Sequence, residues 1–144
     1  MIYEKLNLTD FENLTYLEQQ YKIAIGEPQL TFEQIAALKH AIETGKIEFF
    51  VAKDGENLVG MCSVTVAFST FACGDMGIFE DFFILKTHRS QGIAKSLTGY
   101  VFAEMKARGV ASLWVGSADM DVAMYKSLGF EIPLGNLLTW SADA

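Results

Sequence analysis

Two adjacent carboxylates, Glu80 and Asp81, interrupt an apolar stretch of the chain, and a small polar loop follows that stretch. The loop, residues 89–94, reads Arg-Ser-Gln-Gly-Ile-Ala and leads into a helical pattern. A carboxylate among apolar neighbours is costly unless it has a partner or a function. A strand that runs through a glycine-containing loop into a helix start is a natural phosphate site, because free amides and the helix dipole favour an anion. We therefore expect a phosphate-binding junction with acid–base groups beside it.

The elements that must position this junction are predicted from hydrophobic spacing and turn residues. The stretch around the carboxylates is apolar enough for a strand covered on both faces. We predict strands at 2–6, 47–53, 58–68, 76–85, 111–115, 130–133 and 137–140, and helices at 10–25, 31–44, 93–108 and from 119 or 121 to 128. The order β-α-α-β-β-β-α-β-α-β-β predicts one α+β domain over residues 1–144. Its mixed sheet has three consecutive antiparallel strands, and the strand at 111–115 is parallel to the one before it.

The composition narrows the class of protein. The chain has 144 residues, of which 51% are hydrophobic and 20% charged, as in a globular domain. No apolar run approaches the roughly 18 to 20 residues of a membrane span, and the N-terminus does not resemble a signal peptide. We expect a cytoplasmic protein with no membrane partner. The net charge of -7 argues against nucleic acid and mildly favours a cationic small molecule.

Metal and thiol chemistry have little support in the sequence. The two cysteines, Cys62 and Cys73, and the two histidines, His40 and His88, show no spacing typical of metal ligands. We expect no metal. The cysteines are interpreted as reduced thiols, although a covalent cysteine route remains an alternative mechanism.

Two motifs together resemble the GNAT superfamily of acetyl-CoA-dependent N-acetyltransferases. Residues 89–94 match that family's loop, written as Arg or Gln, two variable residues, Gly, one variable, then Gly or Ala. Residues 125–130, Tyr-Lys-Ser-Leu-Gly-Phe, resemble the family's tyrosine helix end followed by Gly-Phe. The element order resembles the family over nearly the whole chain. The resemblance implies a GNAT-like mixed, mostly antiparallel sheet flanked by helices, with acetyl-CoA as co-substrate.

The resemblance also implies a role for each part of the junction. The loop would bind the pyrophosphate, and the main chain of the strand would bind the pantetheine arm and polarise the thioester carbonyl. The implied cofactor-binding residues are Phe82, Phe83, Ile84, Arg89, Ser90, Gln91, Gly92, Ile93, Ala94 and Lys95. For Arg89 and Lys95 a purely solvated role is an equal alternative, and the three strand side chains need only be core residues.

Two catalytic residues and a substrate class follow from the same comparison. Tyr125 matches the family's general acid for the departing thiolate; the alternative is a core tyrosine with a satisfied hydroxyl. Glu80 is suited to accept the proton of the amine, directly or through a water. Burial beside aromatic residues would favour its neutral form and so raise its affinity for that proton. Its alternative is a carboxylate paired with a basic residue. Glu80 and Asp81 also resemble the matching segment of diamine and polyamine acetyltransferases, which implies that both bind a small cationic amine. Adjacent strand residues face opposite ways, so both enter one pocket only if a bulge intervenes.

The sequence departs from the family at one position that contacts the cofactor. Ala118 stands seven residues before Tyr125, where the family often has asparagine. We predict direct acetyl transfer to a primary amine. The alternatives are a protein or peptide N-acetyltransferase and a catalytically silent acyl-CoA-binding regulatory module. A homodimer is expected because it would cover exposed strand edges near the C-terminus.

Overall fold

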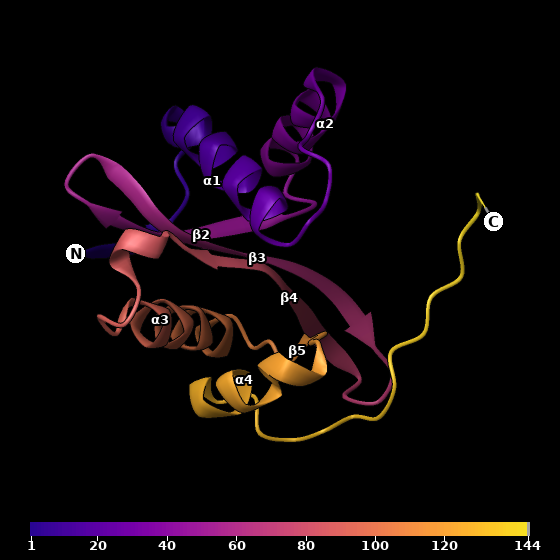
Figure 1. The fold of residues 1–144 in the computed structure, drawn as a ribbon. Helices are drawn as coiled ribbons and strands as arrows, with labels where there is room; N and C mark the ends of the chain where they lie inside the picture. The colour runs from indigo at the N-terminus through magenta and orange to yellow at the C-terminus, as the bar shows by residue number, and fades with distance from the viewer. Residues whose placement is uncertain (144) are drawn as a thin grey trace.

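A single mixed sheet runs through the molecule, a computed structural model that describes residues 1–143 (Figure 1). Its strands are β1 (Ile2–Lys5), β2 (Glu48–Asp54), β3 (Asn57–Ser69), β4 (Gly74–Ile84) and β5 (Leu113–Val115). They lie in the order β1-β2-β3-β4-β5. Pairing is antiparallel from β1 to β4, and β5 is parallel to β4. The predicted α+β class, the antiparallel meander and the parallel strand after it are confirmed.

Helices cover both faces of the sheet. On one face lie α1 (Phe11–Ala24) and α2 (Phe32–Glu43), and on the other lie α3 (Ile93–Ala107) and α4 (Val122–Leu128) (Figure 1). Thr31 and Gln34 form a capping box at the start of α2, with both reciprocal hydrogen bonds present. Short 3-10 turns at Leu8–Asp10, Lys86–His88 and Asp119–Asp121 precede α1, the loop before α3, and α4.

Each face of the sheet has its own hydrophobic cluster. Phe49, Met61 and Leu14 belong to the cluster under α1, and Phe50 and Leu97 belong to the cluster under α3. Because neighbouring strand residues point to opposite faces, a sheet covered twice needs consecutive apolar residues. This is the physical reason for the apolar run that β4 shows in the sequence.

The two strands predicted at 130–133 and 137–140 are wrong. Residues 130–141 form neither helix nor strand, and this C-terminal tail extends away from the sheet (Figure 1). Pro133 lacks the amide that a ladder needs, and Gly135 has a φ of +91°, which breaks an extended run. Apolar alternation alone does not make a strand, because a strand also needs a neighbouring edge to bond.

Candidate active site

A β-bulge in β4 gives Glu80 and Asp81 a common side. Ser63 of β3 pairs with Glu80, but Met61, two residues earlier, pairs with Phe83, so β4 has one extra residue. Asp81 takes a positive φ of +53°, as a bulge residue in the left-handed region does. The bulge that the sequence required for both carboxylates to share a pocket is therefore present.

Packing shows which side that is. Phe82 packs with the cluster under α3, and Phe83 packs with the cluster under α1. Ser63 alternates with Met61 and so faces α1, and its Oγ donates a hydrogen bond of 2.6 Å to Asp81 Oδ2. Glu80, paired with Ser63 across the ladder, shares that face. Both carboxylates thus lie on the α1 side of β4.

The edge of β4 opens beside the bulge. Pairing with β5 covers only Gly77 to Phe79. From Glu80 to Ile84, β4 has no strand partner on that edge among residues 1–143, while its other edge stays bonded to β3. The main-chain groups along this open edge can bond to an extended ligand in place of a strand.

The loop after β4 presents free amides at the start of α3. Gly92 is the residue before α3 and has a φ of +79°, and Ser90 has a φ of +62°. The first amides of a helix have no partner within it, so those of Ile93, Ala94 and Lys95 point out of its N-terminus. A side-chain carbon at Gly92 would meet no atom within 4 Å, so the loop has open space in front of it. This geometry suits a pyrophosphate.

The side chains of the loop have mixed roles. Arg89 Nε donates to the Ile84 carbonyl at 2.9 Å, and its guanidinium lies 5.5 Å from the centre of the Phe83 ring. Arg89 therefore ties the loop to the end of β4. Gln91 Nε2 donates to the Thr87 carbonyl, whereas the side chain of Lys95 is exposed to solvent.

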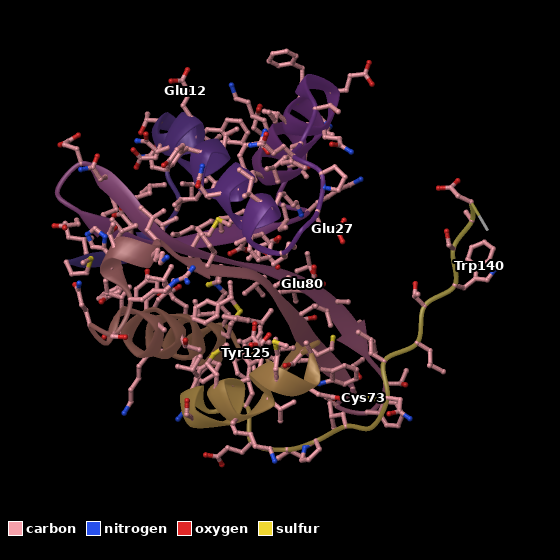
Figure 2. The ribbon with its side chains drawn as sticks, viewed as in Figure 1. Glu12, Glu27, Cys73, Glu80, Tyr125 and Trp140 are labelled. Carbon is pink, nitrogen blue, oxygen red and sulfur yellow. The ribbon has the colours of Figure 1, made fainter. Side chains whose placement is uncertain are left out.

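Tyr125 lies on α4, on the face of β4 opposite to Glu80 (Figure 2). Its ring is half-buried, with centroids 6.2 Å from Phe82 and 5.8 Å from Phe130. Burial raises the pKa of its hydroxyl, and the nearby Asp121 and Cys62 raise it further. Within residues 1–143 the hydroxyl makes no hydrogen bond to another protein group.

The Gly-Phe pair after Tyr125 has a packing role. Gly129 ends α4 with a φ of +118°, and a side-chain carbon there would lie 2.7 Å from Phe102. Phe130 packs against Phe79 and Phe102 at centroid distances of 5.1 and 5.2 Å. The pair holds α4 on the sheet and so fixes where Tyr125 stands.

Glu80 differs from its prediction in one respect. It was expected to be buried beside aromatic residues, but it is exposed on β4. Strand alternation turns it to the α1 face, because it directly follows Phe79, which packs on the other side with Phe82. It makes no ion pair within residues 1–143, so the alternative of a paired surface carboxylate is not seen either.

The buried carboxylate of the region is Glu18, which the sequence interpretation missed. Glu18 lies on α1 and is 3% exposed, and its Oε1 has no hydrogen-bond partner within residues 1–143. Burial raises the pKa of Glu18 to about 7, Asp81 raises it as well, and Lys22 opposes them. Tyr21, also on α1, has its pKa raised to about 12, first by burial and then by Asp81. Glu18 stands four residues after Leu14, within the apolar stripe of α1, and that spacing was the available signal.

Neither cysteine favours a covalent route. Cys62 is fully buried opposite the bulge, and burial raises the pKa of its thiol far above the usual range, which disfavours the thiolate. Cys73 is exposed at the turn between β3 and β4 (Figure 2). No group of three metal-ligating side chains forms within residues 1–143.

Ala118 and a surface groove complete the region. Ala118 is exposed before α4, and only its carbonyl is engaged, by the Ser117 hydroxyl and the Asp121 amide. It offers none of the side-chain hydrogen bonds of an asparagine.

A groove of about 370 Å³ runs between α1 and the end of β4; Tyr16, Gln20, Phe83 and Arg89 are among the residues that line it. Among the described residues, no helix is long and apolar enough to span a bilayer.

Comparison with known proteins identifies the family. The acetyltransferase (GNAT) domain family matches residues 45–132, and the chain belongs to this family. Among curated protein sequences, none matches the chain.

Solved structures share the fold over nearly the whole chain. A probable acetyltransferase superposes with a TM-score of 0.86 at 19% identity, covering 98% of this chain and 99% of the other. A predicted acetyltransferase from Clostridium acetobutylicum with acetyl-CoA has a TM-score of 0.79 at 18% identity, covering 96% and 94%. An aminoglycoside acetyltransferase from an uncultured soil metagenomic sample, in complex with sisomicin, has a TM-score of 0.84 at 15% identity, covering 97% and 94%.

Acetyl-CoA is the co-substrate of the family, and two features of this chain fit it. The open space and free amides at Gly92 suit the pyrophosphate, and the unpaired edge of β4 suits the amide-bearing pantetheine arm. The two features are consecutive in the chain.

Proposed function

We propose that this protein transfers an acetyl group from acetyl-CoA to a primary amine of a small cationic molecule by direct attack. The observation that carries the proposal is the bulge at Asp81. It places two carboxylates on one face, at the point where β4 parts from β5 and just before the Gly92 loop. Negative charge beside a thioester site suits an ammonium group that has to become a neutral amine.

The proposed mechanism assigns a step to each group. Acetyl-CoA supplies the acetyl thioester. An amide of the open edge, between Phe82 and Ile84, polarises the thioester carbonyl, and Glu80 takes the proton of the amine directly or through a water. The amine nitrogen bonds to the carbonyl carbon, the carbon–sulfur bond breaks, and Tyr125 gives its phenolic proton to the departing thiolate. The acetylated nitrogen gives its second proton to solvent. The proton on Glu80 also returns to solvent, and Tyr125 is protonated again from it, so each turnover of an ammonium substrate releases one proton.

Release of free thiol from acetyl-CoA tests the function. The acceptor panel should contain diamines, polyamines, aminoglycosides, amino sugars, amino acids and peptides, with acetyl-CoA affinity measured by calorimetry. Acetylation of small cationic amines supports the proposal. Turnover only with peptides would favour a protein or peptide acetyltransferase, and binding without release on every acceptor would favour a silent acyl-CoA-binding module.

Two variants test the catalytic roles. Tyr125→Phe should slow turnover by roughly the 10²–10⁴-fold typical of acid–base groups. Glu80→Gln should lower the rate mainly at lower pH, where more of the amine is protonated, with acetyl-CoA still bound. Unchanged turnover in both variants would remove these assignments.

We further propose that the protein is a homodimer. Support comes from the C-terminal tail, whose apolar residues Ile132, Leu134, Leu137, Leu138 and Trp140 are all more than 60% exposed. Such a surface is better satisfied against another protein than in water.

A further inference from the structure

Glu18 is a carboxyl side chain inside the protein to which the proposed mechanism gives no role. It lies on the buried side of α1 and is 3% exposed, yet its Oε1 has no hydrogen-bond partner within residues 1–143. An unpaired buried carboxylate oxygen costs free energy, and such atoms usually indicate a missing ligand, ion or water. The position calls for a hydrogen-bond donor from outside the chain.

The groups that face Glu18 make its surroundings negative. Asp81 acts on Glu18 from the bulge of β4, and Tyr21, three residues further along α1, lies near Glu18, Asp81 and Glu80. Lys22 is the cation whose charge reaches Glu18. Its Nζ lies 5.4 Å from the centre of the Tyr21 ring, and within residues 1–143 it forms no ion pair with Glu18. The other cation of this region, Arg89, lies 5.5 Å from the centre of the Phe83 ring and donates to the Ile84 carbonyl rather than to a carboxylate.

Two aromatic rings stand beside these carboxylates. Tyr21 and Phe83 have ring centroids 5.9 Å apart and tilted by 53°, and Phe83 packs on the α1 side of β4, as Asp81 does. Aromatic faces attract an ammonium group, and a carboxylate adds charge-assisted hydrogen bonds to it. Carboxylates with aromatic rings are a suitable lining for an alkylammonium.

We propose that Glu18, together with Asp81, binds an ammonium group of the acceptor other than the one that is acetylated, so that the acceptor is a diamine or polyamine. The inference rests on the proposed function and specifies its substrate class. Glu80 is exposed at the open edge of β4, whereas Glu18 is buried under α1. Two anionic positions of different depth fit two ammonium groups of one molecule. No bond forms or breaks at Glu18, whose role is to set specificity.

A pair of acceptors of equal length tests the proposal. 1,4-Diaminobutane and 4-aminobutan-1-ol have the same reacting amine and differ in the second ammonium. Wild type should prefer the diamine in kcat/KM by roughly 10- to 100-fold, the range for hydrogen bonds to charged groups. Glu18→Gln should abolish most of this preference through KM, with kcat little changed, and Asp81→Asn provides a second variant with the same expected loss. Preserved preference in both variants would overturn the proposal.

The matched control is Glu12→Gln, which removes a carboxylate from the exposed side of the same helix (Figure 2). It should keep the preference of wild type. Thermal unfolding with and without 1,4-diaminobutane tests binding apart from turnover: the diamine should raise Tm in wild type and Glu12→Gln, but not in Glu18→Gln. This shift without thiol release on any acceptor would refute the proposed function and keep the ammonium site. If thiol is released but wild type and Glu18→Gln show the same preference for the diamine, the proposed function stands and the ammonium site at Glu18 is refuted.

Discussion

At the scale of single residues, three carboxylates near β4 stand in three different environments. Asp81 accepts a hydrogen bond from Ser63, Glu80 is exposed, and Glu18 is buried with an unpaired oxygen. Environment decides what a carboxylate does, because burial favours the protonated form and hydrogen bonds favour the charged one. Buried polar groups without partners are kept in proteins mainly where function needs them, at a cost in stability.

The cost of Glu18 leads to a prediction about stability and pH. Its pKa is raised from 4.5 to about 7 in the folded state, so the folded protein holds this proton more tightly than the unfolded chain does. The contribution of protonated Glu18 to the free energy of unfolding is therefore fully present below pH 4.5. It is lost as pH rises through about 7. The loss reaches about 3 kcal/mol, from about 1.4 kcal/mol per pKa unit. Relative to wild type, the free energy of unfolding of Glu18→Gln should therefore increase by up to that amount as pH rises from 5 to 8.

Urea unfolding of both proteins at several pH values between 5 and 8 measures this difference. The charged and titratable groups around Glu18 are Asp81, Glu80, Tyr21 and Lys22, and they are the same in both proteins. A free-energy difference that does not change with pH would contradict a raised pKa at Glu18. Glu12→Gln is the control and should track wild type at every pH.

At the scale of elements, the sequence predicts the strand, the loop and the helix. It predicts only in part which side chains these elements place in the candidate site. The loop and the Tyr-to-Phe motif are local patterns, so their positions on β4, α3 and α4 could be read directly. The bulge depends on how β3 pairs with β4, which no local pattern specifies. For that reason the sequence leaves open whether Asp81 lies on the same face as Glu80. Glu18 was missed because a buried charge in an apolar stripe is explained only by what packs against it.

The loop before α3 gives a prediction that separates binding from backbone strain. In Gly92→Ala, the new methyl group would project into the open space that we assign to the pyrophosphate. The KM for acetyl-CoA should rise roughly tenfold, equivalent to about 1.4 kcal/mol of binding free energy. The same substitution forces alanine into a left-handed conformation at a φ of +79°, which costs stability of about 1 kcal/mol.

The chain contains a matched control for that strain. Gly109, just after α3, has a φ of +78° and equally open surroundings, but it lies at the other end of the helix. Gly109→Ala should lose similar stability in thermal unfolding and keep the acetyl-CoA affinity of wild type in calorimetry. Equal loss of affinity in the two variants would show that strain, not the space at Gly92, controls binding.

At the scale of the whole molecule, the sheet has two edges, and its last strand is short. β5 has three residues and no strand on its outer side among residues 1–143. The tail passes close to the end of β5, where a side-chain carbon at Gly116 would lie 3.1 Å from Leu137 Cδ2. An unpaired edge beside an exposed apolar segment is a template for association.

The dimer prediction follows from this arrangement. Light scattering after size exclusion should give the mass of two chains for wild type, and the double variant Leu138→Ser with Trp140→Ser should shift the mass toward one chain. Both residues are more than 80% exposed on a tail that extends from the body (Figure 1, Figure 2), so their replacement removes no core packing. Phe32→Ser on α2, where the ring is 93% exposed, is the matched control and should leave the mass unchanged. A wild-type mass of one chain at concentrations up to about 100 μM would exclude a dimer with the affinity of a stable interface.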